Sequence, residues 1–156
     1  MKEWLKGLLW LCGLVVGLAG CESNDCMLSS GSYCNLAFVD GEGKGVKLLD
    51  TLTVSTTGDN VIINRKLGAE GMDLPLSYTA TVDTFYLKYS TRLADTLWVE
   101  HLNLPYFSSM ECGTVMHYRL TGIQSTTHLI DSVRIVNAEI TNSLKKNVEI
   151  YFTVSD

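Results

Sequence analysis

Cysteine thiols are the side chains of this 156-residue chain whose surroundings point most clearly to defined chemistry. There are five of them: Cys12, Cys21, Cys26, Cys34 and Cys112. A thiolate can form a covalent bond to carbon, join a second cysteine in a disulfide or bind a metal, and its surroundings decide which of these it does. The five stand in different sequence contexts, so we expect different roles for them.

Cys21 directly follows a short apolar segment that ends in Leu18-Ala19-Gly20. A basic start, a short apolar stretch and small residues before a cleavage site are typical of an export signal. With a cysteine in the next position, the segment resembles a bacterial lipoprotein signal peptide, whose cysteine takes a diacylglycerol thioether and becomes the first mature residue. The alternative is a transmembrane helix, which needs about 20 apolar residues. The apolar segment is shorter than that and is interrupted by glycines.

This pattern predicts three parts: a signal peptide over residues 1–20, a lipidated tether over residues 21–31 and one folded domain over residues 32–156. Each buried methylene of an acyl chain contributes about 0.8 kcal/mol, so a cysteine with two or three chains, palmitate among them, is held permanently. We therefore expect acylated Cys21 to bind a lipid bilayer in the cell envelope. The outer membrane is the expected location, with the domain facing the periplasm or the exterior.

Three cysteines of the mature chain remain, which allow one disulfide in three pairings. Cys34 alternates with Leu36 and Phe38 on one strand face, which is typical of a small buried hydrophobe and predicts a free thiol. Cys26 and Cys112 stand in irregular segments, so we expect them to form the bridge, which export from the cytoplasm permits. A zinc site at Cys112 and His117, with His101 or His128, lacks the paired ligand spacing of such sites. We expect no metal and no cofactor.

Composition excludes one class of partner and disfavours one class of activity. The chain has a net charge of −5 and no large Lys/Arg cluster, so it would be repelled by phosphate backbones, and we expect no nucleic-acid binding. No serine stands in the G-x-S-x-G context of a hydrolase nucleophile. We expect no enzyme; a hydrolase, which would need a histidine beside an acid in a cleft, ranks last.

Most of the mature chain alternates apolar and polar residues with period two, which predicts strands with one buried face. Turn residues separate these runs, and no run has helical spacing. The pattern predicts an all-β fold: a single antiparallel β-sandwich, immunoglobulin-like, with a small β-barrel as the alternative. About eight strands are expected, over residues 33–39, 50–55, 61–65, 84–90, 96–102, 114–121, 132–137 and 148–154.

Three aromatic residues lie opposite the apolar faces of predicted strands: Trp98, Tyr86 and Tyr151. Exposed rings of this kind stack on sugars or bind peptides, so they are candidate ligand-binding residues. The alternative is that neighbouring strands or long loop side chains cover them, because aromatic residues are common in strands.

Several blocks of the chain resemble, as a set, an uncharacterised domain-of-unknown-function family of small Bacteroidota lipoproteins. They include Trp98-Val99-Glu100-His101, Ser109-Met110-Glu111-Cys112 and the segments 130–137 and 148–152, and the resemblance extends over about residues 26–154. It implies a single β-rich domain and a pairing of Cys26 with Cys112. It implies no activity and no catalytic residue.

Two further features resemble sequence motifs of exported proteins from such bacteria. Acidic residues after the lipidated cysteine, here Glu22 and Asp25, can direct lipoproteins to the cell surface. An Asp, then Ser or Thr, then an aliphatic residue resembles their O-glycan acceptor motif, which would make Thr51, Thr96 and Ser132 candidate O-glycosylation sites. The alternative for the second feature is that each motif only ends a turn and begins a strand.

The sequence therefore predicts a membrane-anchored envelope lipoprotein whose domain has a structural or binding role and is non-enzymatic. The alternative is a surface module that binds glycans or peptides. An envelope protein or a glycan would be its partner, beside the bilayer.

Overall fold

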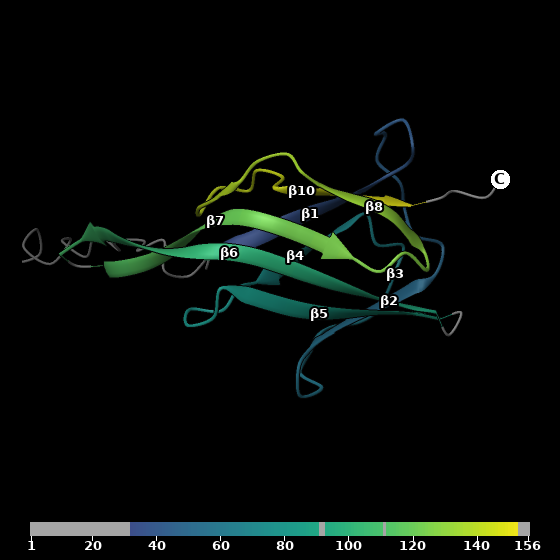
Figure 1. Cartoon of the computed structure of the whole chain (residues 1–156), viewed down its shortest axis with the longest axis horizontal. Coiled ribbons are helices and arrows are strands. Elements are labelled where there is room, and N and C mark those ends of the chain that lie inside the picture. Colours follow the sequence, from purple (N-terminus) through teal and green to yellow (C-terminus); the bar gives the residue numbers. More distant parts are fainter. Residues whose placement is uncertain (1–31, 91–92, 111, 153–156) are drawn as a thin grey trace, which may run out of the picture.

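The computed structural model describes residues 32–90, 93–110 and 112–152, and these residues form ten strands and no helix. The strands form two sheets that face each other (Figure 1). The first has four strands in the order β4-β1-β10-β8, and the second has six in the order β3-β2-β5-β6-β7-β9. The strands are β1 (Tyr33–Val39), β2 (Thr51–Thr56), β3 (Val61–Leu67), β4 (Gly71–Pro75), β5 (Val82–Tyr89), β6 (Ala94–Ser109), β7 (Gly113–Ser125), β8 (Ile130–Ile135), β9 (Glu139–Ile140) and β10 (Val148–Phe152).

The core lies between the two sheets and is built by the alternation seen in the sequence. In β2 the side chains of Leu52 and Val54 are fully buried while the threonines between them are half-buried. Rings from both sheets meet in the middle. Phe152 of β10 packs edge-to-face on Phe38 of β1, with ring centroids 5.2 Å apart, and on Tyr89 of β5 at 6.4 Å. Such pairs add to the stabilisation from burial alone, so they join the two sheets.

The predicted sandwich is confirmed, and its wholly antiparallel arrangement is wrong at one place. β1 and β10 pair in parallel, with Leu36 opposite Val148 and Phe38 opposite Ile150. All eight predicted strands are present, and the structure adds β4 and β9. β9 is only two residues long and depends on its pairing with Tyr118 and Arg119 of β7.

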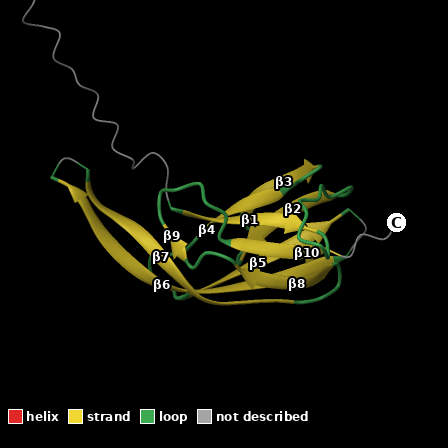
Figure 2. Cartoon of the chain, turned by 90° about the horizontal axis from the view of Figure 1, so that it is seen from above, coloured by secondary structure: helices red, strands yellow, loops and turns green. Residues whose placement is uncertain are grey.

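The longest hairpin extends beyond the sandwich. From Leu104 onward β6 pairs with β7 alone, in a register from Leu104 opposite His117 to Ser109 opposite Gly113. We call residues 104–110 and 112–117 the arm. It leaves the sandwich at the end where β1 begins, as Figure 2 shows from above. The sequence predicted that β6 would end near Leu102, so the arm was not expected.

Candidate functional site

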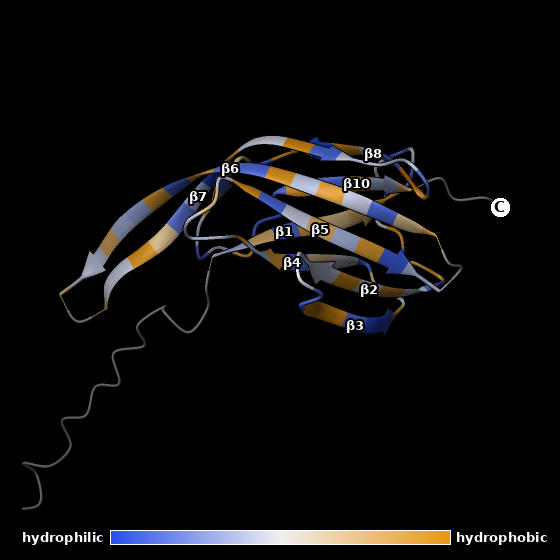
Figure 3. Ribbon diagram, turned by 60° about the horizontal axis from the view of Figure 1, so that its bottom comes forward, coloured by the Kyte–Doolittle hydropathy of each residue, from blue (hydrophilic) through white to orange (hydrophobic). Residues whose placement is uncertain are grey.

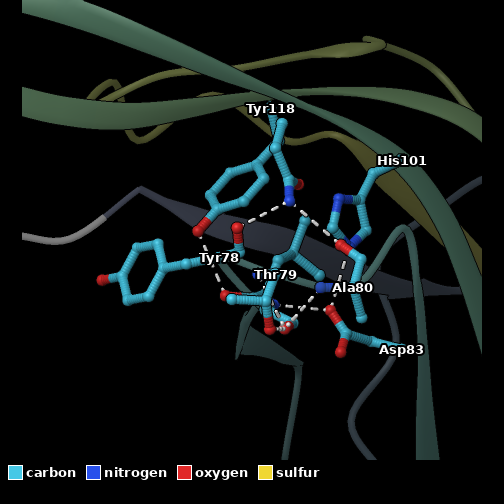
Figure 4. A network of polar contacts seen from close by, with 9 residues as sticks. Tyr78, Thr79, Ala80, Asp83, His101 and Tyr118 are labelled. Atoms are coloured by element: carbon cyan, nitrogen blue, oxygen red, sulfur yellow. Dashed lines mark hydrogen bonds and ion pairs between the residues drawn. The ribbon is translucent and has the colours of Figure 1, made fainter.

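A buried histidine, His101, pairs with the half-buried Asp83 near the place where the arm joins the sandwich (Figure 4). The Nε2 of His101 lies 3.0 Å from Oδ2 of Asp83, and the His101 side chain is fully buried. The same Asp83 oxygen accepts a hydrogen bond from the backbone N–H of Ser77 at 2.7 Å. A carboxylate only accepts, so His101 donates through Nε2–H and its Nδ1 carries no proton when the ring is neutral. Nδ1 has no hydrogen-bond partner among the described residues.

Two further side chains hold the loop between β4 and β5 against this pair. The ring of Tyr118 meets the His101 ring edge-on at 5.2 Å, and its hydroxyl donates to the carbonyl of Leu76 at 3.1 Å. Burial, with smaller contributions from Tyr78 and Asp83, raises the pKa of Tyr118 to about 12, so the hydroxyl stays a donor. Asn103 donates to the carbonyls of Tyr78 and Ala80, at 2.9 and 3.0 Å. These contacts fix the base of the arm.

The pair resembles two members of a hydrolytic triad, but its burial gives it a different role. A nucleophile would have to reach the free Nδ1 of His101, together with a substrate. The His101 side chain has no solvent access, and no hydroxyl or thiol bonds to Nδ1 among the described residues. We therefore interpret the His101–Asp83 pair as a positioning contact for the loop.

The other two histidines have separate partners. His117 lies on the arm and stacks on Tyr106, with ring centroids 5.0 Å apart and planes 10° apart. His128 lies 3.2 Å from Asp95, through Nδ1 and Oδ1. The three histidines predicted as possible catalytic or zinc-binding groups are therefore not brought together. Within residues 32–90, 93–110 and 112–152, no group of three potential metal-ligating side chains could hold an ion.

Asp95 is a buried acid that organises the turn before β8. Its Oδ1 accepts from the Thr126 hydroxyl at 2.7 Å and the His128 amide at 2.8 Å. Its Oδ2 accepts from the amides of Leu129 and Ile130 at 2.9 and 3.2 Å. Burial alone would raise the pKa of Asp95, but these donors outweigh it and hold the pKa below its ordinary value. Asp95 thus joins the start of β6 to a turn more than thirty residues later.

The three candidate ligand-binding aromatics do not form one surface. Trp98 and Tyr86 lie on the outer face of the six-stranded sheet, where Trp98 pairs with Thr84 and Tyr86 with Thr96. Tyr151 lies on the outer face of the other sheet, because its neighbours Ile150 and Phe152 point into the core. A ligand on Trp98 and Tyr86 could not reach Tyr151.

Tyr151 belongs instead to a charged cluster around Glu149. The Glu149 carboxylate accepts from Lys146 at 2.5 Å, from Arg134 at 2.6 Å and from the Tyr151 hydroxyl at 3.0 Å. The Arg134 guanidinium also lies over the Tyr151 ring, 5.5 Å from its centroid. The bond from Lys146, followed by those from Arg134 and Tyr151, lowers the pKa of Glu149 from 4.5 to about 2.

This cluster gives a prediction about stability and pH. The folded state holds the Glu149 pKa below its unfolded value, so the stability from its ionisation is present above pH 4.5 and is lost as the pH falls towards 2. Glu149→Gln should lower the free energy of unfolding at pH 7 by about 1–2 kcal/mol. It should also flatten the stability profile below pH 4.5, measured by urea unfolding at a series of pH values.

The matched control is Glu70→Gln, which removes an exposed ion pair with Lys47. Exposed pairs contribute little, so this variant should unfold almost like the wild type at pH 7. A Glu149→Gln variant that keeps the full wild-type slope between pH 4.5 and 2 would contradict the prediction.

The candidate O-glycosylation sites differ in accessibility. Ser132 is exposed on β8, which is an edge strand of the four-stranded sheet. Thr51 and Thr96 are half-buried. The backbone of Thr96 is also paired with Thr126, through the Thr126 hydroxyl at 2.9 Å and the Thr126 amide at 3.0 Å. A glycan needs an exposed acceptor, so Ser132 is the acceptor most compatible with this geometry.

Two cysteines, Cys34 and Cys112, lie within the described residues. Cys34 lies in β1 as a fully buried free cysteine, and burial, with a smaller effect of Asp73, raises its thiol pKa to about 12. This matches the expected role as a small hydrophobe. Cys112 lies at the tip of the arm, where its amide donates to the Ser109 hydroxyl at 3.0 Å. Cys21 and Cys26 lie outside the described residues, so lipidation and the Cys26–Cys112 pairing stay predictions.

The sequence analysis missed two surfaces. One is the arm, on which Tyr106, Phe107 and Met110 are largely exposed. The other is a groove of about 490 Å³ between β3 and β4, the edge strands of the two sheets. Alternation in residues 104–109 was a signal for the arm, whereas nothing in the sequence places β3 beside β4. The groove is lined by Leu36, Ile62, Ile63, Lys66, Glu70, Gly71, Met72 and Asp73.

Comparisons with known proteins give a family and nothing further. The model of a family of unknown function (DUF6452) matches residues 51–152. No curated protein and no solved structure matches the chain. In the part of the chain that the structure describes, no helix is long and apolar enough to cross a membrane.

Proposed function

Because the chain belongs to DUF6452, a family of unknown function, we propose its role from the chemistry of its own residues. The protein is a lipoprotein of a Gram-negative cell envelope, anchored by acylated Cys21 and facing the periplasm or the exterior. Its sandwich has a non-enzymatic, structural or binding role there. The single observation that carries the proposal is Cys21 directly after Leu18-Ala19-Gly20, at the end of a short basic and apolar leader.

Features of the fold support this proposal. The sandwich has an apolar core closed between its sheets, and its described histidines serve as structural partners or lie apart. The chain leading back to Cys21 enters at Ser32, whose hydroxyl bonds the Asn142 side chain at 2.9 Å. An anchor before this point would leave the sandwich outside the bilayer.

Lipid labelling of the full chain in a Gram-negative host tests the proposal. We expect radiolabelled palmitate to enter the wild type and the Cys26→Ser variant, and not the Cys21→Ser variant. The mass of the wild-type protein should show loss of residues 1–20 and gain of acyl chains. Cys26→Ser is the matched control, because it removes a neighbouring thiol and leaves the motif intact. An unlabelled wild type that keeps its first twenty residues would overturn the proposal.

A second candidate function has one observation in its favour. Trp98 and Tyr86 lie on adjacent strands and share the outer face of the six-stranded sheet, and Tyr86 is exposed. Two neighbouring rings on an open sheet face can stack on sugars or on peptide side chains. Binding to a glycan array that is lost in Trp98→Ala and kept in Tyr151→Ala would favour this surface module.

A further inference from the structure

The arm is a two-stranded ribbon, and among the described residues no third strand pairs with it. Within the part of the chain that the structure describes, its strands pair only with each other beyond Leu104 and His117, so neither outer edge is paired with a further strand there. A ribbon of two strands is at best marginally stable in water unless something else packs on it. Its base is held by the hydrogen bonds that Tyr118 and Asn103 donate to the loop between β4 and β5.

Most side chains of the arm are apolar or aromatic, and its other side chains are those of serine, threonine and histidine. Tyr106 is 53% exposed, Phe107 58% and Met110 92%. Hydrophobic positions occur on both of its strands (Figure 3). Between residues 104 and 117 the sequence has one Asp, Glu, Lys or Arg, which is Glu111. An exposed apolar patch on an otherwise acidic protein marks a contact site, and tyrosine is enriched where protein meets the lipid headgroups.

The arm lies at the end of the domain where the tether enters. β1 begins at Tyr33, which pairs with Pro75, and the next residue, Leu76, accepts the hydrogen bond from Tyr118 at the base of the arm. The parallel strand β10 therefore ends at the opposite end of the sandwich. The tether that leads back to Cys21 and the arm therefore lie at the same end of the domain.

The lengths of the two segments are compatible. Ten residues lie between Cys21 and Ser32, and the eleven residue steps of this segment span at most about 40 Å when fully extended. The six residues Leu104–Ser109 rise about 3.3 Å each, so the arm extends about 20 Å from the sandwich. A tether extended by about half its reach brings the tip of the arm to the bilayer.

We propose that the arm contacts the lipid bilayer that anchors the chain, with Tyr106, Phe107 and Met110 at the headgroup–acyl boundary. This inference rests on the proposed lipid anchor at Cys21. The bilayer would cover the apolar side chains of the arm and give the domain one fixed orientation on the membrane. The acidic sandwich would stay at a distance from the surface.

Quenching of a single tryptophan tests the contact. After removal of residues 1–20, Trp98 is the one tryptophan of the chain, so Trp98→Phe provides a silent background. In that background, F107W places the reporter on the arm. L67W is the matched control, because Leu67 is 71% exposed and lies far from the arm. It pairs with Thr51, the first residue of β2. Both proteins are purified acylated and reconstituted into phosphatidylcholine vesicles.

We expect vesicles with bromine on the upper acyl chain to lower the emission of F107W by about twofold and to leave L67W nearly unchanged, as an interfacial position requires. M110W should repeat the result of F107W at a second position. Equal emission of F107W and L67W in protein that floats with the vesicles would overturn the contact. So would an F107W reporter shielded from aqueous acrylamide but not quenched by lipid, since a second copy or a partner protein would then cover the arm. Protein that does not float would count against the lipid anchor itself, and with it against both proposals.

Discussion

Replacing Asp95 by alanine is expected to lower the free energy of unfolding by about 3 kcal/mol or more, because buried donors lose their acceptor. Asp95 is 1% exposed and accepts from the amides of His128, Leu129 and Ile130. Water can replace the carboxylate only in part at this site, since the Ile130 side chain is also buried. Urea unfolding followed by far-ultraviolet circular dichroism measures the change.

Asp131→Ala is the matched control for this prediction. Asp131 begins the same Asp–Ser/Thr–aliphatic motif but is exposed, so its removal should change stability by less than about 0.5 kcal/mol. Asp95→Asn should fall between the two variants, because one side-chain oxygen remains as an acceptor. Equal stability of Asp95→Ala and Asp131→Ala would show that the turn before β8 does not depend on this carboxylate.

Gly71→Ala is expected to destabilise the domain by about 2 kcal/mol or more, because the added methyl group has no room. A Cβ at this position would lie 2.3 Å from the backbone carbonyl oxygen of Leu36. Gly71 pairs with Ala37 where β4 meets β1, so the clash would push these strands apart. Thermal unfolding and faster amide hydrogen exchange in β1 and β4 would report it.

Gly122→Ala tests the same reasoning at a place where the neighbour can move. Its Cβ would lie 2.7 Å from Oε2 of Glu100, the far end of a flexible side chain. Glu100 can turn away at little cost, so this variant should retain most of its stability. A Gly71→Ala protein that unfolds at the same temperature as Gly122→Ala would contradict the argument from backbone contact.

The alternation of apolar and polar residues was sufficient to predict the sandwich and eight of its strands, because one face of each strand is buried. It was not sufficient for the length of β6. Pro105 marks a loop in a sequence, since proline cannot donate a hydrogen bond within a sheet. Here Pro105 lies in the arm, opposite Met116 on β7, and no other described strand pairs with it on its second side. The missing third strand explains why a proline is tolerated there.

The sequence predicted which face of its strand each candidate aromatic residue lies on, but it did not predict to which sheet that strand belongs. Trp98 and Tyr151 each point away from the core, as their neighbours in the chain indicated. Which sheet holds each strand depends on pairings between distant segments, and these separate the two rings onto opposite sides. Asp95 shows the same limit. Its motif suggested a strand start or a glycan acceptor, whereas its hydrogen-bond donors come from residues 126–130.

The parallel pairing of β1 with β10 has a consequence for biogenesis. The four-stranded sheet has the first and last strands of the domain as its two central members, so β1 has no partner on one side until residues 148–152 are available. Bringing Leu36 next to Val148 closes a long loop, which is slow and costs conformational entropy before the contacts between the two strands form. In a chain that leaves the ribosome or a translocation pore N-terminus first, the four-stranded sheet would therefore stay incomplete until residues 148–152 have emerged.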